Sequence, residues 1–158
     1  MQATTIAISL GALLLLAAAP NSSEPKPATP PIPAAEGTKE PDHITIQHVL
    51  IGFSGSVPGK NITRTQDEAK KLADEILARA KQGENFEELV KKYTDDSAPG
   101  IYSMANTGVA PAAGEYPRGR MVRAFGDAGF PLQVGEIGMA PYDSAKSPFG
   151  WHIVKRLK

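Results

Sequence analysis

The alternation of apolar and polar positions predicts a β-strand beginning near residue 44. Residues 44–51 are rich in β-branched side chains, and Ile44, Ile46, His48 and Leu50 share one side of a two-residue period. Because successive side chains of a strand point to opposite faces of the sheet, His48 is expected among large apolar neighbours.

Two helical patterns follow this strand. Thr65 and Glu68 match a capping box, in which the threonine caps the helix and the glutamate returns to the cap's backbone amide. Apolar residues then recur every three or four positions up to Ala80, and Gly83 supplies the stop. Asn85 opens a second, shorter helix. The apolar residues of its buried face are Phe86, Leu89, Val90 and Tyr93.

The rest of the chain is less regular. Residues 101–105 form a strand-like piece inside a stretch rich in glycine, proline and alanine. Residues 121–128 are expected to form a short helix, and residues 137–142 and 149–157 are predicted to pair as an antiparallel hairpin. This order of elements predicts an α+β domain with a small, mainly antiparallel sheet.

Proline is concentrated upstream of this domain. Seven of the 14 prolines fall between residues 20 and 41, so we interpret residues 20–42 as an extended, semi-stiff linker and residues 43–158 as one domain. Residues 6–19 form an apolar run that is too short to span a bilayer and is typical of a secretory signal. We therefore expect residues 1–19 to be a signal peptide or an uncleaved anchor, and the domain to be exported.

Charge and composition argue against several classes of function. The chain carries 17 basic and 17 acidic side chains with no long run of one sign, so no field directs it to nucleic acid or to an anionic membrane. It has no cysteine, which excludes disulfides, thiol nucleophiles and thiolate metal sites. It also lacks the H-E-x-x-H and G-x-S-x-G patterns. We expect a monomer with no metal, cofactor or nucleic acid, and no membrane contact by the domain itself.

Two histidines and one acidic pair are the residues best suited to chemistry. His48 lies in the first predicted strand and His152 in the last, each beside large apolar residues. Such a histidine is by itself more often a hydrogen-bonded core residue than a catalyst. If the two strands are neighbours, however, the imidazoles can hydrogen-bond and form a polar spot in an apolar bowl. Asp95 and Asp96 form either a turn after the second helix or part of this site.

Between about Ile44 and Leu157 the chain resembles the parvulin family of peptidyl-prolyl cis/trans isomerases. Several separated motifs carry the resemblance, namely QHVLI at 47–51, GENFEEL at 83–89, YTDDS at 93–97, RGRMVRAF at 118–125, GEI at 135–137 and SPFGWHIVK at 147–155. Each motif is weak alone, but together their order and spacing are specific.

The resemblance implies a four-stranded, mainly antiparallel sheet flanked by about four helices. It also implies that His48 and His152 are the family's paired active-site histidines, and that Asp96 stands where members carry either cysteine or aspartate. These three residues are expected to be catalytic. The residues expected to bind substrate are Met121 and Phe125, which grip the proline ring, together with Phe149 and Ser147.

One segment, residues 98–117, departs from the family pattern. Most members follow the acidic motif with a glycine-glycine-x-leucine-glycine turn, whose leucine forms a wall of the proline pocket. This chain instead has a longer segment rich in glycine, alanine and proline. Tyr102 and Met104 are the two alternatives for the missing leucine.

The resemblance therefore predicts a peptidyl-prolyl isomerase that acts without a covalent intermediate on X-Pro bonds of unfolded or extended exported polypeptides, and so assists protein folding. Phospho-specificity is not expected, because the loop at 52–64 offers only Lys60 and Arg64 where phosphate-binding members carry a basic cluster. The altered segment leaves open a chaperone-like module of the same fold that binds peptides without catalysis. A structural domain on a proline-rich stalk is the third alternative.

Overall fold

The computed structural model describes residues 39–158. The predicted signal or anchor at residues 1–19, and the predicted linker up to residue 38, lie outside the described residues. Within residues 39–158, no helix has both the length and the apolar character needed to cross a membrane.

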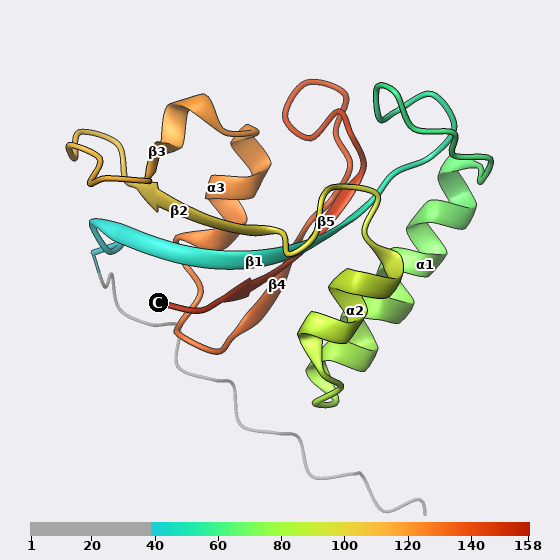
Figure 1. Ribbon diagram of the computed structural model, residues 1–158, viewed down its shortest axis with the longest axis horizontal. Helices are drawn as coiled ribbons and strands as arrows, with labels where there is room; N and C mark the ends of the chain where they lie inside the picture. The colour runs from blue at the N-terminus through green and yellow to red at the C-terminus, as the bar shows by residue number, and fades with distance from the viewer. Residues whose placement is uncertain (1–38) are drawn as a thin grey trace, which may run out of the picture. The chain divides into compact units, whose positions relative to one another are not determined.

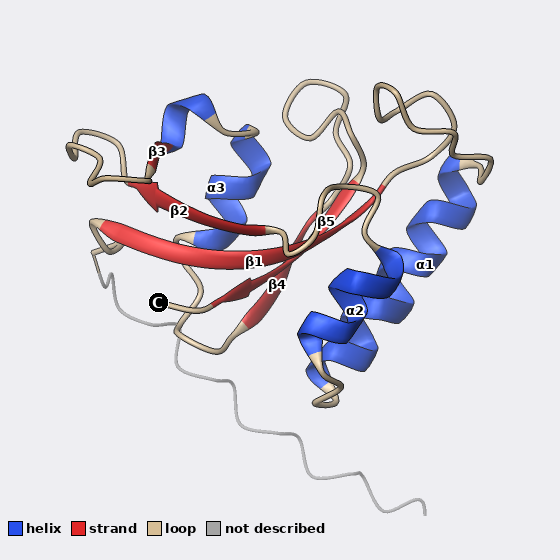
Figure 2. Cartoon of the chain, in the orientation of Figure 1, coloured by secondary structure: helices blue, strands red, loops and turns tan. Residues whose placement is uncertain are grey.

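The fold is a five-stranded sheet with helices packed on its two faces (Figure 1). In chain order, the elements are β1 (His43–Ile51), α1 (Gln66–Lys81), α2 (Phe86–Tyr93), β2 (Ile101–Ala105), β3 (Tyr116–Pro117), the 3-10 helix η1 (Arg118–Arg120), α3 (Arg123–Gly129), β4 (Ile137–Ala140) and β5 (Trp151–Arg156). The strand order is β3-β2-β1-β5-β4, which makes the first and last strands central neighbours (Figure 2). The predicted α+β class is confirmed.

The sheet and its helices differ from the prediction in two details. A fifth strand, Tyr116–Pro117, pairs in parallel with the end of β2, while all other strand pairs are antiparallel. The helix predicted from residue 121 begins at Arg123, because Met121 has extended backbone angles and its N–H closes the 3-10 turn onto the carbonyl of Arg118. Residues 39–158 therefore contain three α-helices and one 3-10 helix.

The predicted antiparallel hairpin is present, but its strands are shorter than expected. Residues 141–150 form the connection. Within it, the carboxylate of Asp143 accepts hydrogen bonds from the backbone N–H groups of Ala145 and Lys146, both at 2.8 Å. This local turn gives the backbone an alternative to strand pairing, so the ladder stops before it.

The two-residue period of β1 divides its side chains between two cores. Val49 and Ile51 are completely buried beneath α1 and α2. Ile44 and Ile46 point to the opposite face, where they pack in one cluster with Phe125 of α3. Alternate residues of β1 therefore lie on the α3 side of the sheet. His48 is on this side, because it lies two positions after Ile46.

The starts of α1 and α2 follow from their own local sequences. At α1, Thr65 accepts from the N–H of Glu68 at 3.2 Å, and the carboxylate of Glu68 accepts from the N–H of Thr65 at 2.7 Å, which confirms the predicted capping box. At α2, Asn85 accepts from the N–H of Glu88 at 3.2 Å. Each cap satisfies a helix N–H that has no partner within the helix.

Gly100 allows the chain to enter β2 directly beside His48. Its φ of +63° lies in the left-handed region, and a Cβ at this position would be 2.7 Å from the carbonyl oxygen of His48. The N–H of His48 also donates to the carbonyl of Gly100 at 2.9 Å. The turn between α2 and β2 is therefore pressed against the strand that carries His48.

We predict that Gly100→Ala lowers the free energy of unfolding by about 2–4 kcal/mol, because it adds a backbone clash to the strain of a positive φ. Gly108→Ala is the matched control, since Gly108 has a φ of +81° but nothing within 4 Å of an added Cβ. Gly108→Ala should lower the free energy of unfolding by only roughly 1–2 kcal/mol, which is the cost of the left-handed conformation for alanine. Urea unfolding of the two variants measures the difference, and equal losses would contradict the proposed contact.

Candidate functional site

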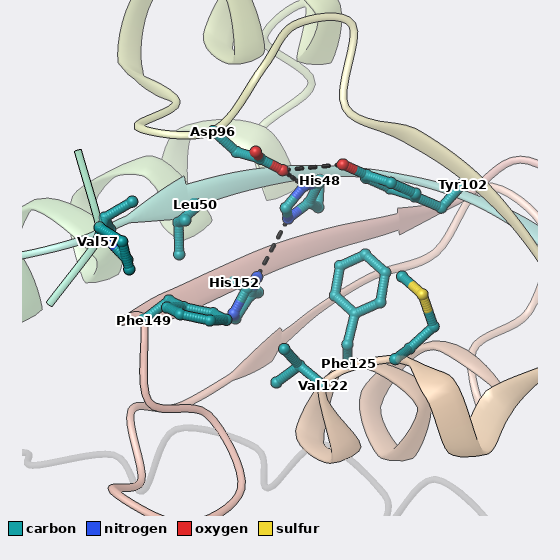
Figure 3. Close-up of a pocket in the computed structure, with 11 residues that line it drawn as sticks. His48, Leu50, Val57, Asp96, Tyr102, Val122, Phe125, Phe149 and His152 are labelled. Carbon is teal, nitrogen blue, oxygen red and sulfur yellow. Dashed lines mark hydrogen bonds and ion pairs between the residues drawn. The ribbon is translucent and has the colours of Figure 1, made fainter. Parts of the chain in front are cut away.

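A cavity of about 310 Å³ opens on the α3 side of the sheet (Figure 3). It is bounded by β1, β2, β5, the start of α3 and the loops that precede α1, β2 and β5. Seven of the nine site residues predicted from the sequence line it, namely His48, Asp96, Tyr102, Met121, Phe125, Phe149 and His152. Residues from both ends of the domain thus meet around one hollow.

The other two predicted residues, Ser147 and Met104, do not line this cavity. Both are completely buried. The hydroxyl of Ser147 donates to the carbonyl of Gly150 at 2.8 Å, which ties the loop that carries Phe149. Met104 packs in the core beside α3.

Of the two alternatives for the family's leucine, Tyr102 is the one that reaches the cavity. Tyr102 pairs with Ile46 across the sheet, whereas Met104 pairs with Ile44. Tyr102 is therefore two positions nearer to His48 along the same face, and its ring centroid lies 5.4 Å from that of His48.

Four lining residues were not predicted: Leu50, Val57, Pro58 and Val122. The sequence contained a signal for two of them, because Leu50 shares the strand face of His48 and Val122 follows Met121 directly. Val57 and Pro58 come from the loop between β1 and α1. The course of that loop depends on contacts with distant residues, so no local pattern indicates it.

A continuous line of hydrogen bonds runs along the cavity wall (Figure 3). The hydroxyl of Tyr102 donates to Oδ2 of Asp96 at 3.0 Å, and Nε2 of His48 lies 3.0 Å from the same oxygen. Nδ1 of His48 lies 3.1 Å from Nδ1 of His152, and the two rings are nearly parallel. Because Leu50 pairs with His152 across β1 and β5, His152 is the diagonal neighbour of His48 on one face of the sheet.

The surroundings of this line determine its charges. The hydrogen bond from His48 holds the pKa of Asp96 well below its ordinary value, so Asp96 is a carboxylate at neutral pH. Burial lowers the pKa of His152 to about 3, so its imidazole is neutral. Burial and the hydrogen bond to Asp96 raise the pKa of Tyr102 to about 12, so it remains a phenol.

These charges assign the hydrogens. A carboxylate only accepts hydrogen bonds, so His48 donates to Asp96 from Nε2. When His48 is neutral, its Nδ1 is an acceptor, and His152 donates to it from Nδ1. Nε2 of His152 then carries no hydrogen, and this buried atom has no hydrogen-bond partner among residues 39–158. The line of hydrogen bonds therefore ends at an acceptor nitrogen that receives no hydrogen bond from the described residues.

Aromatic edges surround the two histidines. The ring of Phe125 meets those of His48 and His152 edge-on, with centroid distances of 4.8 and 5.4 Å. Phe125 also packs against Tyr102 at 5.8 Å. The site is thus an apolar bowl with one fixed row of polar atoms, which suits an apolar ring joined to a carbonyl group.

The two adjacent aspartates have separate roles. Asp95 accepts from the N–H of Gly52 at 2.8 Å and forms an ion pair with Arg64, which also donates to the carbonyl of Gly52 at 3.0 Å. These bonds fix both ends of the loop that places Val57 and Pro58 at the cavity. Asp95 therefore holds this loop in place, whereas Asp96 supplies the carboxylate of the site.

Comparison with known proteins identifies the class. The solution structure of TbPIN1 superimposes with a TM-score of 0.56 at 26% identity, covering 74% of this chain and 98% of that one. The fold is that of the parvulin-like isomerases, as the resemblance implied. The family model of the PPIC-type PPIase domain matches residues 34–158. The chain belongs to this family of PPIase domains.

Two curated relatives illustrate how widely the domain is used. The protein dodo of Drosophila melanogaster, named as a peptidyl-prolyl cis-trans isomerase, is 35% identical over 130 residues, which cover 78% of this chain and 70% of dodo. Foldase protein PrsA of Geobacillus kaustophilus is 37% identical over 86 residues, which cover 54% of this chain and 27% of that protein. The match thus spans about a quarter of the foldase.

We predict that His152→Asn weakens the acid sensitivity of the fold. Because the pKa of His152 is about 3 in the folded state and 6.5 without the protein environment, the unfolded chain binds more protons between these values. The free energy of unfolding therefore falls as pH drops from 6.5 towards 3, by up to about 1.4 kcal/mol per pH unit from this residue. The asparagine amide keeps a donor near Nδ1 and does not titrate.

Urea unfolding between pH 7 and pH 4.5 measures this dependence. His152→Asn should lose less stability on acidification than the unsubstituted protein does. His43→Asn, which removes a half-exposed histidine at the start of β1, is the control and should retain most of the dependence. An unchanged slope in His152→Asn would show that His152 is not held neutral by the fold.

Proposed function

We propose that this domain catalyses cis/trans isomerisation of X-Pro bonds in unfolded or extended exported polypeptides, without a covalent intermediate and without phospho-specificity. The observation that carries the proposal is the apolar bowl whose single polar row runs from Asp96 to His152. In this proposal His48, Asp96 and His152 are catalytic. The residues that hold the substrate are Met121, Phe125, Phe149 and Tyr102, while Ser147 and Met104 support them from the loop and the core.

Apolar binding of the proline ring lowers the barrier. Rotation about an X-Pro bond faces roughly 18–20 kcal/mol because amide resonance must be lost. Met121, Phe125 and Phe149 remove water from around the ring and the carbonyl before it. A twisted amide is less charge-separated than a planar one, so a dry site stabilises the transition state more than the ground state.

The polar row sets the field at the rotating bond. Nε2 of His152 is an acceptor that is closed to solvent and has no partner among residues 39–158, so water does not screen its contribution to this field. The charge of Asp96 is held by His48 and Tyr102 before any substrate arrives, so it costs no reorganisation during the reaction. No step requires a nucleophile.

The contacts of the loop between β1 and α1 support the absence of phospho-specificity. Arg64 is engaged by Asp95 and by a backbone carbonyl, which leaves Lys60 as the other basic residue of this loop. At the cavity itself the loop presents Val57 and Pro58. A phosphate before proline would therefore meet an apolar wall and the negative charge of Asp96, and would lose hydration without gaining a cation.

Two observations support an exported polypeptide as substrate. Residues 6–19 have the pattern of a secretory signal. Relatives of this chain carry the names foldase protein PrsA and chaperone SurA, which describe action on other proteins. An extended segment of an unfolded polypeptide presents its X-Pro bonds to a half-open bowl, whereas a folded protein buries many of them.

We predict measurable catalysis of cis/trans exchange on Ala-X-Pro-Phe peptides by NMR exchange spectroscopy. Met121→Ala should lower kcat/KM about tenfold or more, mainly through KM, because it removes apolar contact with the ring. Asp96→Asn should lower kcat more than KM, because it keeps the shape of the site and removes the charge. Lys60→Ala should leave turnover of unphosphorylated peptides unchanged.

The same series distinguishes the alternatives. Peptide binding without acceleration would indicate the chaperone-like module, and the absence of both would indicate a structural domain. A peptide with phosphoserine before proline should be turned over more slowly than its serine counterpart, and faster turnover would contradict the assignment of the loop.

A further inference from the structure

A second cavity, of about 550 Å³, adjoins the proline pocket. Met121 lines both hollows, so they meet at one side chain. Unlike the first cavity, the second is polar. Its polar lining residues are Glu40, Asn106, Thr107, Arg118, Arg123 and Asp127.

Arg118 organises this second cavity. Its guanidinium donates to Glu40 at 2.6 Å, to the side-chain oxygen of Asn106 at 3.0 Å and to Asp127 at 2.9 Å. The same group stacks 4.7 Å from the ring centroid of Phe130, and its side chain is only 18% exposed. Three separate segments are thus fixed around one partly buried cation.

One of these segments is the end of the predicted linker. Asn106 donates from its side chain to Glu40 at 3.2 Å and to the carbonyl of Pro41 at 3.1 Å. Its backbone N–H donates to the carbonyl of Asp42 at 2.8 Å. Residues 40–42 are therefore held against Asn106, and Glu40 forms part of the wall of the second cavity.

Arg123 is the cation in this cavity that remains accessible. Its side chain is 75% exposed, and its Nε lies 3.7 Å from Asp127, which is longer than a hydrogen bond. It can therefore bind an acceptor without disturbing the bonds of Arg118. The neighbouring Thr107 is also exposed and offers a hydroxyl.

We infer that the second cavity is a subsite for the stretch of polypeptide next to the bound proline. It binds a polar segment whose carbonyl or carboxylate groups face Arg123. Glu40, at the end of the predicted linker, forms part of this subsite. The inference rests on the proposed function, because a proline ring held at Met121 directs one flank of the extended chain past that side chain. At about 3.3–3.6 Å per residue, three residues of flank reach about 10 Å beyond the proline.

The test measures turnover of a core peptide, Ala-Ala-Pro-Phe, by the full-length protein. Extended peptides carry Ser-Asp-Ser either before or after this core, and the control peptides carry Leu-Leu-Leu at the same positions. One of the two polar extensions should raise kcat/KM about tenfold through KM, and the leucine extension should not. Arg123→Gln should abolish this advantage. Glu40→Gln, which keeps the shape of the wall but weakens its hold on Arg118, should reduce it.

Two matched controls remove like charges from α1, which lines neither cavity. Lys71→Gln controls for Arg123→Gln, and Glu75→Gln controls for Glu40→Gln; both should keep the full advantage. Equal kcat/KM for core and extended peptides, or an equal loss of advantage in the controls, would overturn the inference.

Failure of the proposed function gives a different result, namely no acceleration of the core peptide. In that case the affinities of core and extended peptides, measured by calorimetry with the same variants, still decide the inference. A polar extension that binds no tighter than the core peptide would overturn it.

Discussion

The hydrogen bond between the Nδ1 atoms of His48 and His152 is the contact on which the site depends. It joins the two central strands at a point where the two residues are only 2% and 4% exposed, and it forms only when one of the two nitrogens carries a hydrogen. When His48 is neutral, Asp96 decides which one, because an ionised carboxylate accepts the Nε2 hydrogen of His48 and leaves Nδ1 of His48 as an acceptor. One charge at the rim of the cavity thereby fixes the hydrogen positions in its floor.

The order of the strands, and the alternation of side chains along each strand, bring the two histidines together. The histidines are 104 residues apart, and only the pairing of β1 with β5 brings them together. Ion pairs then secure the segments on either side of the bowl: Arg64 with Asp95 behind the loop before α1, and Arg118 with Asp127 and Glu40 beside α3. Because each of these cations is anchored by several bonds, we assign them to shaping the substrate groove and not to the reaction.

Features encoded by neighbouring residues were predictable from the sequence. The capping box at Thr65 and the face shared by His48 with the apolar residues of β1 are examples. These local patterns do not show that the two histidines lie side by side. That expectation comes from the family resemblance. The strand Tyr116–Pro117 was missed because a two-residue parallel pairing depends on its tertiary partner. Likewise, the inward bond of Ser147 to a backbone carbonyl has no local signature.

Long-range ¹H–¹⁵N NMR at neutral pH measures the hydrogen positions of the two imidazoles and so tests the polar row directly. We expect His48 to carry its hydrogen on Nε2 and His152 to be neutral with its hydrogen on Nδ1, which leaves Nε2 of His152 as an acceptor without a hydrogen. A charged His152, or a neutral His152 with its hydrogen on Nε2, would contradict the polar row on which the proposed mechanism is built.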